Sequence, residues 1–271
     1  MSIAPETPII TKSQLMRDLA ALGIRPAQTI MLHVSVRAIG WIVGGPDMLI
    51  HALLDLLTPN GTLMMYIAWE DRTDHWPQWS SALQTAYLAE CPPFDPATSR
   101  AYRRWSIVTE YLRTWPGAHR SANPGASVVA VGAHAAWITA DHPLHYGYGV
   151  GTPFAKLCEL DGWVLQIGVP RGTLTLIHHA EHLANLPQKR VYRYPAPLLQ
   201  HGERAWVTIE EYDTSHGIVD GTNGEYMDLL AQEFQQAGYG YHGTVGAASA
   251  FLLQANDLRT FAVQWLEQRY T

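Results

Sequence analysis

A strand-to-helix turn is predicted by the stretch Arg171-Gly172-Thr173-Leu174-Thr175-Leu176-Ile177-His178-His179-Ala180-Glu181-His182, which follows the apolar run of residues 163–169. The apolar run is typical of a buried strand, and Pro170-Arg171-Gly172 closes it with a turn. The apolar residues 174–177 then begin a helix. Turns of this kind are where α/β proteins place their chemistry.

Three histidines and a glutamate gather on this predicted helix. His178 precedes Glu181 by three residues and His182 by four, so these side chains share one helix face. A proton acceptor with a carboxylate beside it is the arrangement that a general base needs. Any one of these histidines alone would favour the alternative of a buried, hydrogen-bonded structural imidazole. Their number, together with Glu181 at the mouth of a strand, favours a functional site.

The N-terminal part of the chain predicts a βαβ unit. Residues 29–34 form a short apolar strand, a Gly-containing loop follows, and Pro46 opens a helix with leucines at helical spacing. Asn60-Gly61 then turns the chain into a strand over residues 62–69. Further segments follow the same alternation, so we expect a single α/β domain spanning residues 1–271, with a central mixed sheet flanked by helices.

The remaining elements are read from the same signals. Helices are predicted near residues 13–22, 106–113, 133–138, 154–160, 224–236 and 257–269, and further strands at 127–131, 191–194 and 205–209. Residues 238–243 are predicted to be a loop. Residues 70–104 lack a clean period and carry many polar and aromatic side chains, which predicts a lid-like insertion on the substrate side.

The loop of residues 35–45 suits an anion. A Gly-containing turn between a strand and a helix presents free backbone amides and a positive helix end, and Ser35 and Arg37 add to that preference. Neither the Walker pattern nor GxGxxG is present, so ATP and nicotinamide dinucleotides are not indicated. A merely tight connection is the alternative.

Two acidic groups follow predicted strands. Glu70, Asp71 and Asp74 follow one strand, and Glu210, Glu211 and Asp213 follow another. Should both strands end on the same side of the sheet, these carboxylates would line a pocket for ammonium groups. Solvated loop carboxylates are the alternative for each residue taken separately.

Composition limits the classes of partner. The formal charge is −6, and no Lys/Arg cluster occurs, so a nucleic-acid footprint is not indicated. The only cysteines, Cys91 and Cys158, form no CxxC pair, which fits a reducing compartment. The N-terminus lacks the apolar core of a signal peptide, and no run is long enough to span a membrane. We therefore expect a cytoplasmic protein without a membrane partner.

Motifs over nearly the whole chain resemble the aminoglycoside 3-N-acetyltransferase family. They are residues 32–35 with Gly40 and Gly44-Gly45, then 61–63, 116–121, 127–132, 151–153, 160–162, 167–169, 175–181 and 245–248. This resemblance implies the antibiotic acetyltransferase fold, which is distinct from the GCN5-related one. The overall pattern looks close to the class-IV type, which acts on apramycin as well as gentamicin-like drugs.

The resemblance implies acetyl transfer from acetyl-CoA, without a metal, to the 3-amino group of the 2-deoxystreptamine ring of aminoglycosides of the apramycin, gentamicin and tobramycin type, which confers resistance. His178 would be the base, Glu181 its partner, and Thr175 (or Thr173) a weaker candidate for the oxyanion contact. The expected coenzyme contacts are His33, Ser35, Val36, Arg37, Gly44, Arg120 and Ser127. The expected drug contacts are Tyr66, Glu70, Asp71, Tyr102, His179, His182, Glu211 and Asp213.

Other functions stay open at this point. The same fold could acetylate a different amine, and the protein would be a monomer or a homodimer in either case. His178 and His182 have a spacing seen in zinc helices, which leaves a metal hydrolase as a rival, although no third ligand is evident. A non-catalytic small-molecule binding protein is the third alternative.

Overall fold

A mixed sheet forms the centre of the computed structural model, which describes residues 7–219 and 226–271. Within these ranges seven strands are ordered β10-β11-β7-β2-β4-β6-β5. The three central strands, β7 (Trp163–Ile167), β2 (Thr29–Val34) and β4 (Thr62–Tyr66), run parallel. Antiparallel strands flank them, namely β11 (Ala248–Gln254), β10 (Tyr241–Val245), β6 (Val128–Gly132) and β5 (His119–Arg120).

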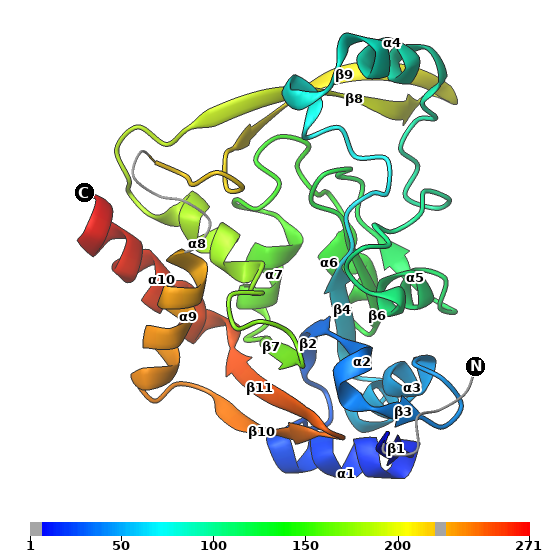
Figure 1. Cartoon of the computed structure of the whole chain (residues 1–271), viewed down its shortest axis with the longest axis vertical. Helices are drawn as coiled ribbons and strands as arrows, with labels where there is room; N and C mark the ends of the chain where they lie inside the picture. The colour runs from blue at the N-terminus through cyan, green and yellow to red at the C-terminus, as the bar shows by residue number, and fades with distance from the viewer. Residues whose placement is uncertain (1–6, 220–225) are drawn as a thin grey trace.

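Helices cover both faces of this sheet (Figure 1). One apolar core contains Met31, Met64 and Val164 and is closed by α7 (Pro153–Glu159), α8 (Leu176–Leu183), α9 (Tyr226–Gln236) and α10 (Ala255–Tyr270). Neighbouring residues of the same strands point to the second core, under α1 (Lys12–Leu22), α3 (Asp47–Leu57) and α5 (Ile107–Arg113). All six residues of β2 are buried, as expected of a central parallel strand.

Shorter elements join these layers. They are α2 (Val36–Ile39), α6 (Ala135–Thr139), the 3-10 turn η1 (Trp76–Gln78), and the parallel pair β1 (Ile9–Ile10) and β3 (Trp41–Ile42). The α/β fold with a central mixed sheet is thus confirmed. Among the described residues, no helix is long and apolar enough to cross a membrane.

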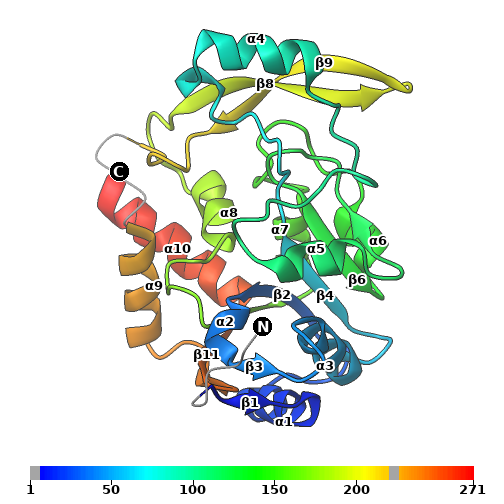
Figure 2. The same ribbon diagram turned by 45° about the vertical axis from the view of Figure 1, so that its right-hand side comes forward.

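A long hairpin stands apart from the sheet. β8 (Val191–Gln200) and β9 (Glu203–Tyr212) pair along their full length, and α4 (Ser81–Glu90) lies beside them in both views (Figures 1 and 2). Trp69 and Phe94 pack in a small cluster with Leu198 of the hairpin. The segment 70–104 is therefore docked on the hairpin. Its role as a lid stays a prediction.

Several predicted elements differ from the structure. The expected loop at residues 238–243 is wrong, because Tyr241 begins β10 and a further strand, β11, follows it. The hairpin strands are longer than expected: β8 begins at the expected residue 191 but extends past 194 to Gln200, and β9 is longer than 205–209 at both ends. The segment 70–104 contains η1 and the helix α4. Residues 224 and 225, where a helix was expected to begin, and the first six residues, which bear on a signal peptide, lie outside the described residues.

Candidate active site

The site lies at the carboxyl ends of the three central parallel strands. Alternation along each strand directs His33, Tyr66 and Gln166 to the same face of the sheet, and His33 is the register partner of Gln166. The Gln166 amide donates to the carbonyl of Thr173 at 2.9 Å, so β7 holds the loop that leads into α8. This is the edge where open α/β sheets bind their ligands.

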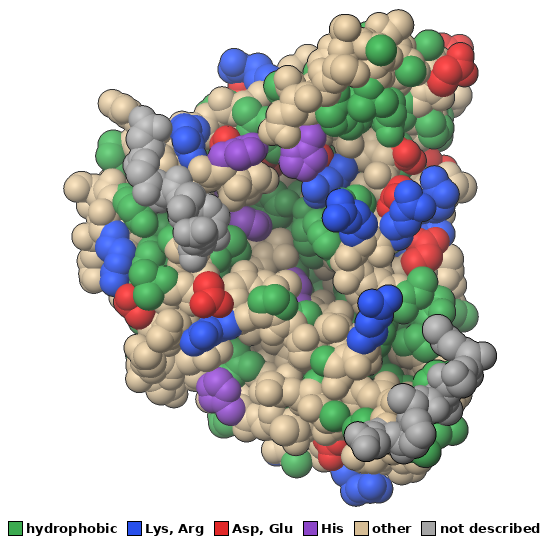
Figure 3. Space-filling model, viewed as in Figure 1, with side chains coloured by type: hydrophobic (Ala, Val, Ile, Leu, Met, Phe, Trp, Pro, Cys, Tyr) green, Lys and Arg blue, Asp and Glu red, His purple; other side chains and the backbone are tan. Residues whose placement is uncertain are grey.

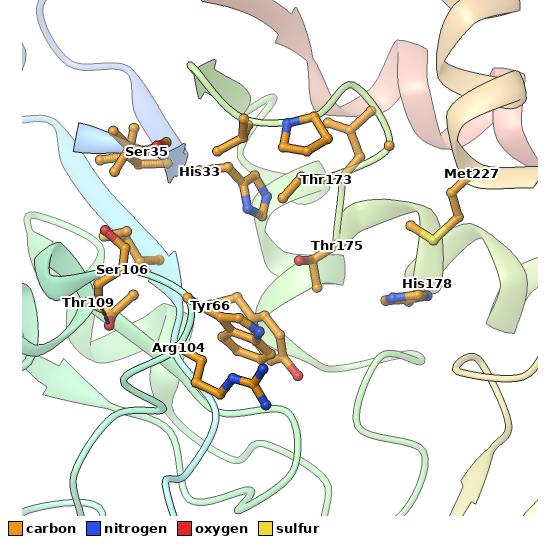
Figure 4. Close-up of a pocket in the computed structure, with 18 residues that line it drawn as sticks. His33, Ser35, Tyr66, Arg104, Ser106, Thr109, Thr173, Thr175, His178 and Met227 are labelled. Atoms are coloured by element: carbon orange, nitrogen blue, oxygen red, sulfur yellow. Dashed lines mark hydrogen bonds between the residues drawn. The ribbon is translucent and has the colours of Figure 1, made fainter. Parts of the chain in front are cut away.

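A central cavity of about 490 Å³ opens at this edge. Figure 3 shows the corresponding face of the molecule hollowed, with Lys, Arg and His side chains around the hollow. Figure 4 shows His33, Thr175 and His178 directed toward the same space. The other polar side chains in its lining are Ser35, Tyr66, Arg104, Trp105, Ser106, Thr109 and Thr173.

His178 and Glu181 form a hydrogen-bonded pair. Both lie on α8, three residues apart, and His178 Nδ1 is 2.6 Å from Glu181 Oε2. The Glu181 side chain is fully buried, whereas that of His178 is 19% exposed. Because a carboxylate only accepts, the proton sits on Nδ1 and the lone pair on Nε2. The ring is thereby oriented as a proton acceptor.

A second cavity, which we call the tyrosine cavity, adjoins the first. Its volume is about 210 Å³, and it shares Tyr66, Trp105 and His178 with the central cavity. Burial raises the pKa of Tyr66 to about 12, so its hydroxyl stays protonated at neutral pH. His178 therefore faces two adjoining spaces. The rest of the lining is Arg72, Asp74, Gly125, Tyr148, Tyr192, Tyr194, Glu211, Thr214 and Ser215.

The predicted acidic residues separate into two groups. Glu211 lines the tyrosine cavity and is held by the backbone amide of Gly147 at 2.6 Å and by His182 Nε2 at 2.7 Å. Asp213 lines an adjoining outer cavity of about 140 Å³. Glu70 and Asp71 instead face Arg103 (2.7 Å) and Arg100 (3.8 Å) and are absent from the lining of these cavities.

The expected coenzyme contacts also separate. His33 and Ser35 line the central cavity. Val36, Arg37 and Gly44 line a loop cavity of about 500 Å³, which is formed by residues 36–46 next along the chain. The imidazole of His33 has a pKa lowered to about 4 by burial, so it is neutral at pH 7, and its Nε2 has no hydrogen-bond partner among residues 7–219 and 226–271.

Arg120 and Ser127 have other partners. The Arg120 guanidinium donates to Ser127 Oγ at 3.1 Å and to the Ala68 carbonyl at 2.8 Å, and it lies 4.9 Å from the ring of Phe94. Ser127 is fully buried. Burial lowers the pKa of Arg120 to about 9. The pair therefore braces the insertion against the sheet, and this placement gives no support to an anion contact.

Three of the expected drug contacts lie behind the cavities. His179 is buried, donates through Nδ1 to the Tyr148 carbonyl at 2.7 Å, and has a pKa lowered by burial to about 4. Tyr102 carries the guanidinium of Arg72 above its ring at 4.7 Å. His182 contacts Glu211 from outside the cavity lining. These three residues support the walls of the cavities and do not line the cavities themselves.

Sequence reasoning left several cavity residues out of the expected site. Arg72 lies in the insertion, whose irregular pattern gave no direction to its side chains, and Asp74, although it belongs to the first predicted acidic group, was not among the expected drug contacts. Trp105, Tyr148 and Tyr192 come from three separate segments that only the tertiary structure brings together. Within the described residues, no group of three or more His, Cys, Asp or Glu side chains is arranged to hold a metal ion.

Comparisons with known proteins agree over nearly the full length of the chain. The family model for aminoglycoside 3-N-acetyltransferase matches residues 31–267. An aminoglycoside N(3)-acetyltransferase III of Pseudomonas aeruginosa is 50% identical over 260 residues, which cover 96% of this chain and 94% of that protein. The structure of AAC-IIIb with CoASH superposes with a TM-score of 0.91 at 44% identity, covering 97% of this chain and 98% of that one.

Two further solved structures extend the comparison. AAC-VIa bound to sisomicin is 34% identical with a TM-score of 0.90, covering 97% of this chain and 99% of that chain. Apo AAC(3)-IVa is 28% identical with a TM-score of 0.81, and the match covers 98% of this chain and 92% of that chain. The family match, the identity over nearly the full length and the shared fold lead to one conclusion: the chain belongs to the aminoglycoside 3-N-acetyltransferase family.

Proposed function

We propose that this enzyme transfers the acetyl group of acetyl-CoA to the 3-amino group on the 2-deoxystreptamine ring of aminoglycosides. The observation that carries the proposal is the position of His178 between the central and tyrosine cavities, with its Nδ1 on Glu181. A direct transfer needs two substrates to meet at one proton acceptor. The relatives with CoASH and with sisomicin support this pair of substrates.

Each cavity is assigned to one substrate. The acetylated end of the coenzyme would occupy the central cavity, and its remaining part would pass Ser35 toward the loop cavity. The loop cavity offers Arg37 and the backbone around Gly44-Gly45 to the anionic groups of coenzyme A. The aminoglycoside would occupy the tyrosine cavity, where Glu211 meets an ammonium group and tyrosine rings meet the sugar faces.

The proposed chemistry begins with a proton. An ammonium group has no lone pair, so His178 Nε2 accepts a proton from the 3-amino group, and Glu181 stabilises the imidazolium that forms. The amine nitrogen then attacks the thioester carbonyl carbon. As the C–N bond forms and the C–S bond breaks, the nitrogen loses its second proton, the thiolate receives one proton so that coenzyme A leaves as the thiol, and the proton taken up by His178 is released to solvent. The side chain or amide of Thr175 or Thr173 stabilises the oxyanion.

The product has one positive charge fewer than the substrate. Acetylation converts a basic amine into a neutral amide, which removes an electrostatic contact from a drug that relies on its cationic groups. Resistance to the drug is the expected consequence for a cell that holds this enzyme.

The finer drug range is a separate part of the proposal. The resemblance to class IV predicts activity on apramycin in addition to gentamicin and tobramycin. The identity to AAC(3)-IVa is 28%, against 50% to the type III enzyme of Pseudomonas aeruginosa. We therefore propose gentamicin-like and tobramycin-like drugs as substrates first, and apramycin as the member of the panel that tests the class-IV resemblance.

The test is incubation of the purified protein with acetyl-CoA and a panel of aminoglycosides. Thiol release measures turnover, and mass spectrometry with NMR locates the acetyl group. One added acetyl group on the 3-amino nitrogen supports the proposal. Acetylation only of unrelated amines would favour the rival reading of an N-acetyltransferase for another amine. Ligand binding without thiol release would favour a non-catalytic binding protein.

A further inference from the structure

A positively charged side chain lines the cavity that we assign to a polycationic drug. Arg72 contributes to the lining of the tyrosine cavity together with Asp74 and Glu211. We propose that Arg72 is a fixed counter-ion of Asp74 and a specificity-determining residue, which disfavours an amino group and accepts a hydroxyl group at this end of the aminoglycoside. This inference rests on the proposed function and adds a discrimination between drugs.

Contacts on several sides hold Arg72 in place. Its Nε lies 3.3 Å from Asp74 Oδ1, and a terminal nitrogen lies 3.1 Å from His75 Nε2. The guanidinium stacks over the rings of Tyr102 at 4.7 Å and Trp105 at 5.5 Å. The side chain is 19% exposed. A planar guanidinium held by an ion pair and two rings is preorganised, so displacing it from the cavity is costly.

Asp74 is the carboxylate that this guanidinium compensates. It lines both the tyrosine cavity and the outer cavity, and its side chain is 14% exposed. Its Oδ1 is buried at ion-pair distance from Arg72 and has no hydrogen-bond partner among the described residues. A ligand in the tyrosine cavity can therefore meet only the remaining exposed part of the Asp74 side chain. Its negative charge, however, is already balanced by the neighbouring guanidinium.

The pair changes what the cavity recognises. An ammonium group placed against Asp74 also approaches Arg72, and the repulsion offsets much of the attraction to the carboxylate. A hydroxyl group carries no charge, so it can donate to Asp74 and accept from Arg72 without that cost. Specificity here comes from a repulsive element as well as an attractive one. Glu211, on the hairpin side, is held by His182 and by the backbone amides of Gly147 and Tyr212, and it remains suited to an ammonium group.

The experiment compares two aminoglycosides that differ only in an amino or a hydroxyl group on the ring attached to 2-deoxystreptamine. The measured quantity is the ratio of their kcat/KM values, with thiol release as the assay. Arg72→Gln is expected to shift the ratio toward the amino compound by about fivefold or more, the scale of one partly screened charge pair. Arg72→Lys keeps the charge, and its ratio is expected to stay within about twofold of wild type.

Asp74→Asn supplies the opposite perturbation. It leaves the guanidinium uncompensated, so the ratio is expected to move toward the hydroxyl compound. Should Arg72→Gln fail to fold, as judged by its melting temperature, this variant and Arg72→Lys still test the inference. Equal ratios in all variants, or the same shift with glutamine and with lysine, would overturn it. Failure of the wild-type enzyme to acetylate either compound would instead contradict the proposed function.

Discussion

At the scale of single residues, Glu181 determines how His178 can act. It is fully buried, and within the described part of the chain only its Oε2 has a hydrogen-bond partner, His178 Nδ1 at 2.6 Å. Replacing it by Gln keeps the size and one acceptor atom but removes the charge that stabilises an imidazolium. We expect Glu181→Gln to lower kcat by about tenfold or more with little change in acetyl-CoA affinity. Steady-state kinetics and coenzyme titration measure both quantities.

An exposed glutamate provides the matched control. Glu203 lies at the turn end of the hairpin, outside both cavities, and Glu203→Gln is expected to leave kcat unchanged. A full wild-type kcat in Glu181→Gln would show that the buried carboxylate only supports the helix.

This residue pair could be predicted from the sequence because its formation requires only the helical period. His178 and Glu181 are three residues apart, so any helix brings them to one face. Arg120 offers the contrast. Its positive charge suggested that it binds an anionic group of the coenzyme, but its guanidinium donates to Ser127 and to a backbone carbonyl inside the protein. Which partner a long side chain reaches depends on tertiary contacts that no local pattern contains.

At the scale of elements, Gly168 packs the end of β7 against α2, which lies in the loop proposed to bind coenzyme A. It follows β7 with φ of +63°, and its amide donates to the Ser249 carbonyl at 2.8 Å. A Cβ added there would lie 2.4 Å from the Cβ of Ala38 on α2. We expect Gly168→Ala to lower the free energy of unfolding by about 1–3 kcal/mol and to weaken acetyl-CoA binding.

The control for this substitution is Gly202, in the turn of the hairpin. It also has a positive φ, of +83°, but an added Cβ would meet nothing within 4 Å. Gly202→Ala is therefore expected to cost only the backbone strain, about 1 kcal/mol, with coenzyme affinity unchanged. Urea denaturation and coenzyme titration of the two variants separate strain from steric contact. Equal losses of unfolding free energy and of coenzyme affinity in the two variants would contradict the proposed contact between β7 and α2.

Elements with a strong local signal were predicted well, whereas edge strands were not. β2 begins and ends as expected because its apolar residues fill a central position. β8 contains Pro195 and Pro197, which usually end a strand, but its only ladder within the described residues is with β9, and its isolated bridge to Phe94 uses the Pro197 carbonyl and the Leu199 amide, so neither proline has to donate there. β10 is largely exposed, so its Gly-rich sequence resembled a loop.

At the scale of the whole molecule, three buried histidines couple folding to pH. Burial lowers the pKa of His33, His142 and His179 to about 4 each, below the ordinary 6.5. Between these values the unfolded chain binds more protons than the folded one. The free energy of unfolding is therefore expected to fall as pH drops from about 6.5 to 4, by about 1.4 kcal/mol per pH unit for each histidine.

Urea denaturation at pH 7, 6 and 5 measures this dependence. His142→Asn removes one of the three groups and should flatten the curve, whereas His119→Asn, at an exposed position on β5, should leave it unchanged. Equal unfolding free energies at pH 7 and pH 5 in the unmodified protein would contradict the account of neutral buried imidazoles.

The arrangement of the site across the whole molecule was only partly predictable. Ordered motifs along the chain were enough for the fold class and the family. The motifs could not show that Glu211 lines the tyrosine cavity whereas Glu70 faces Arg103. Those placements arise because the hairpin and the insertion meet only in the folded protein. Asp74 enters the site for the same reason.

The central claim is that His178, facing both cavities, removes the proton from the drug. The most direct measurement is the turnover of His178→Ala with acetyl-CoA and an accepted aminoglycoside, beside His119→Ala as the exposed control. We predict that His178→Ala loses about 100-fold or more in kcat while its acetyl-CoA affinity stays within about twofold of wild type. Turnover retained at the level of His119→Ala would contradict the claim.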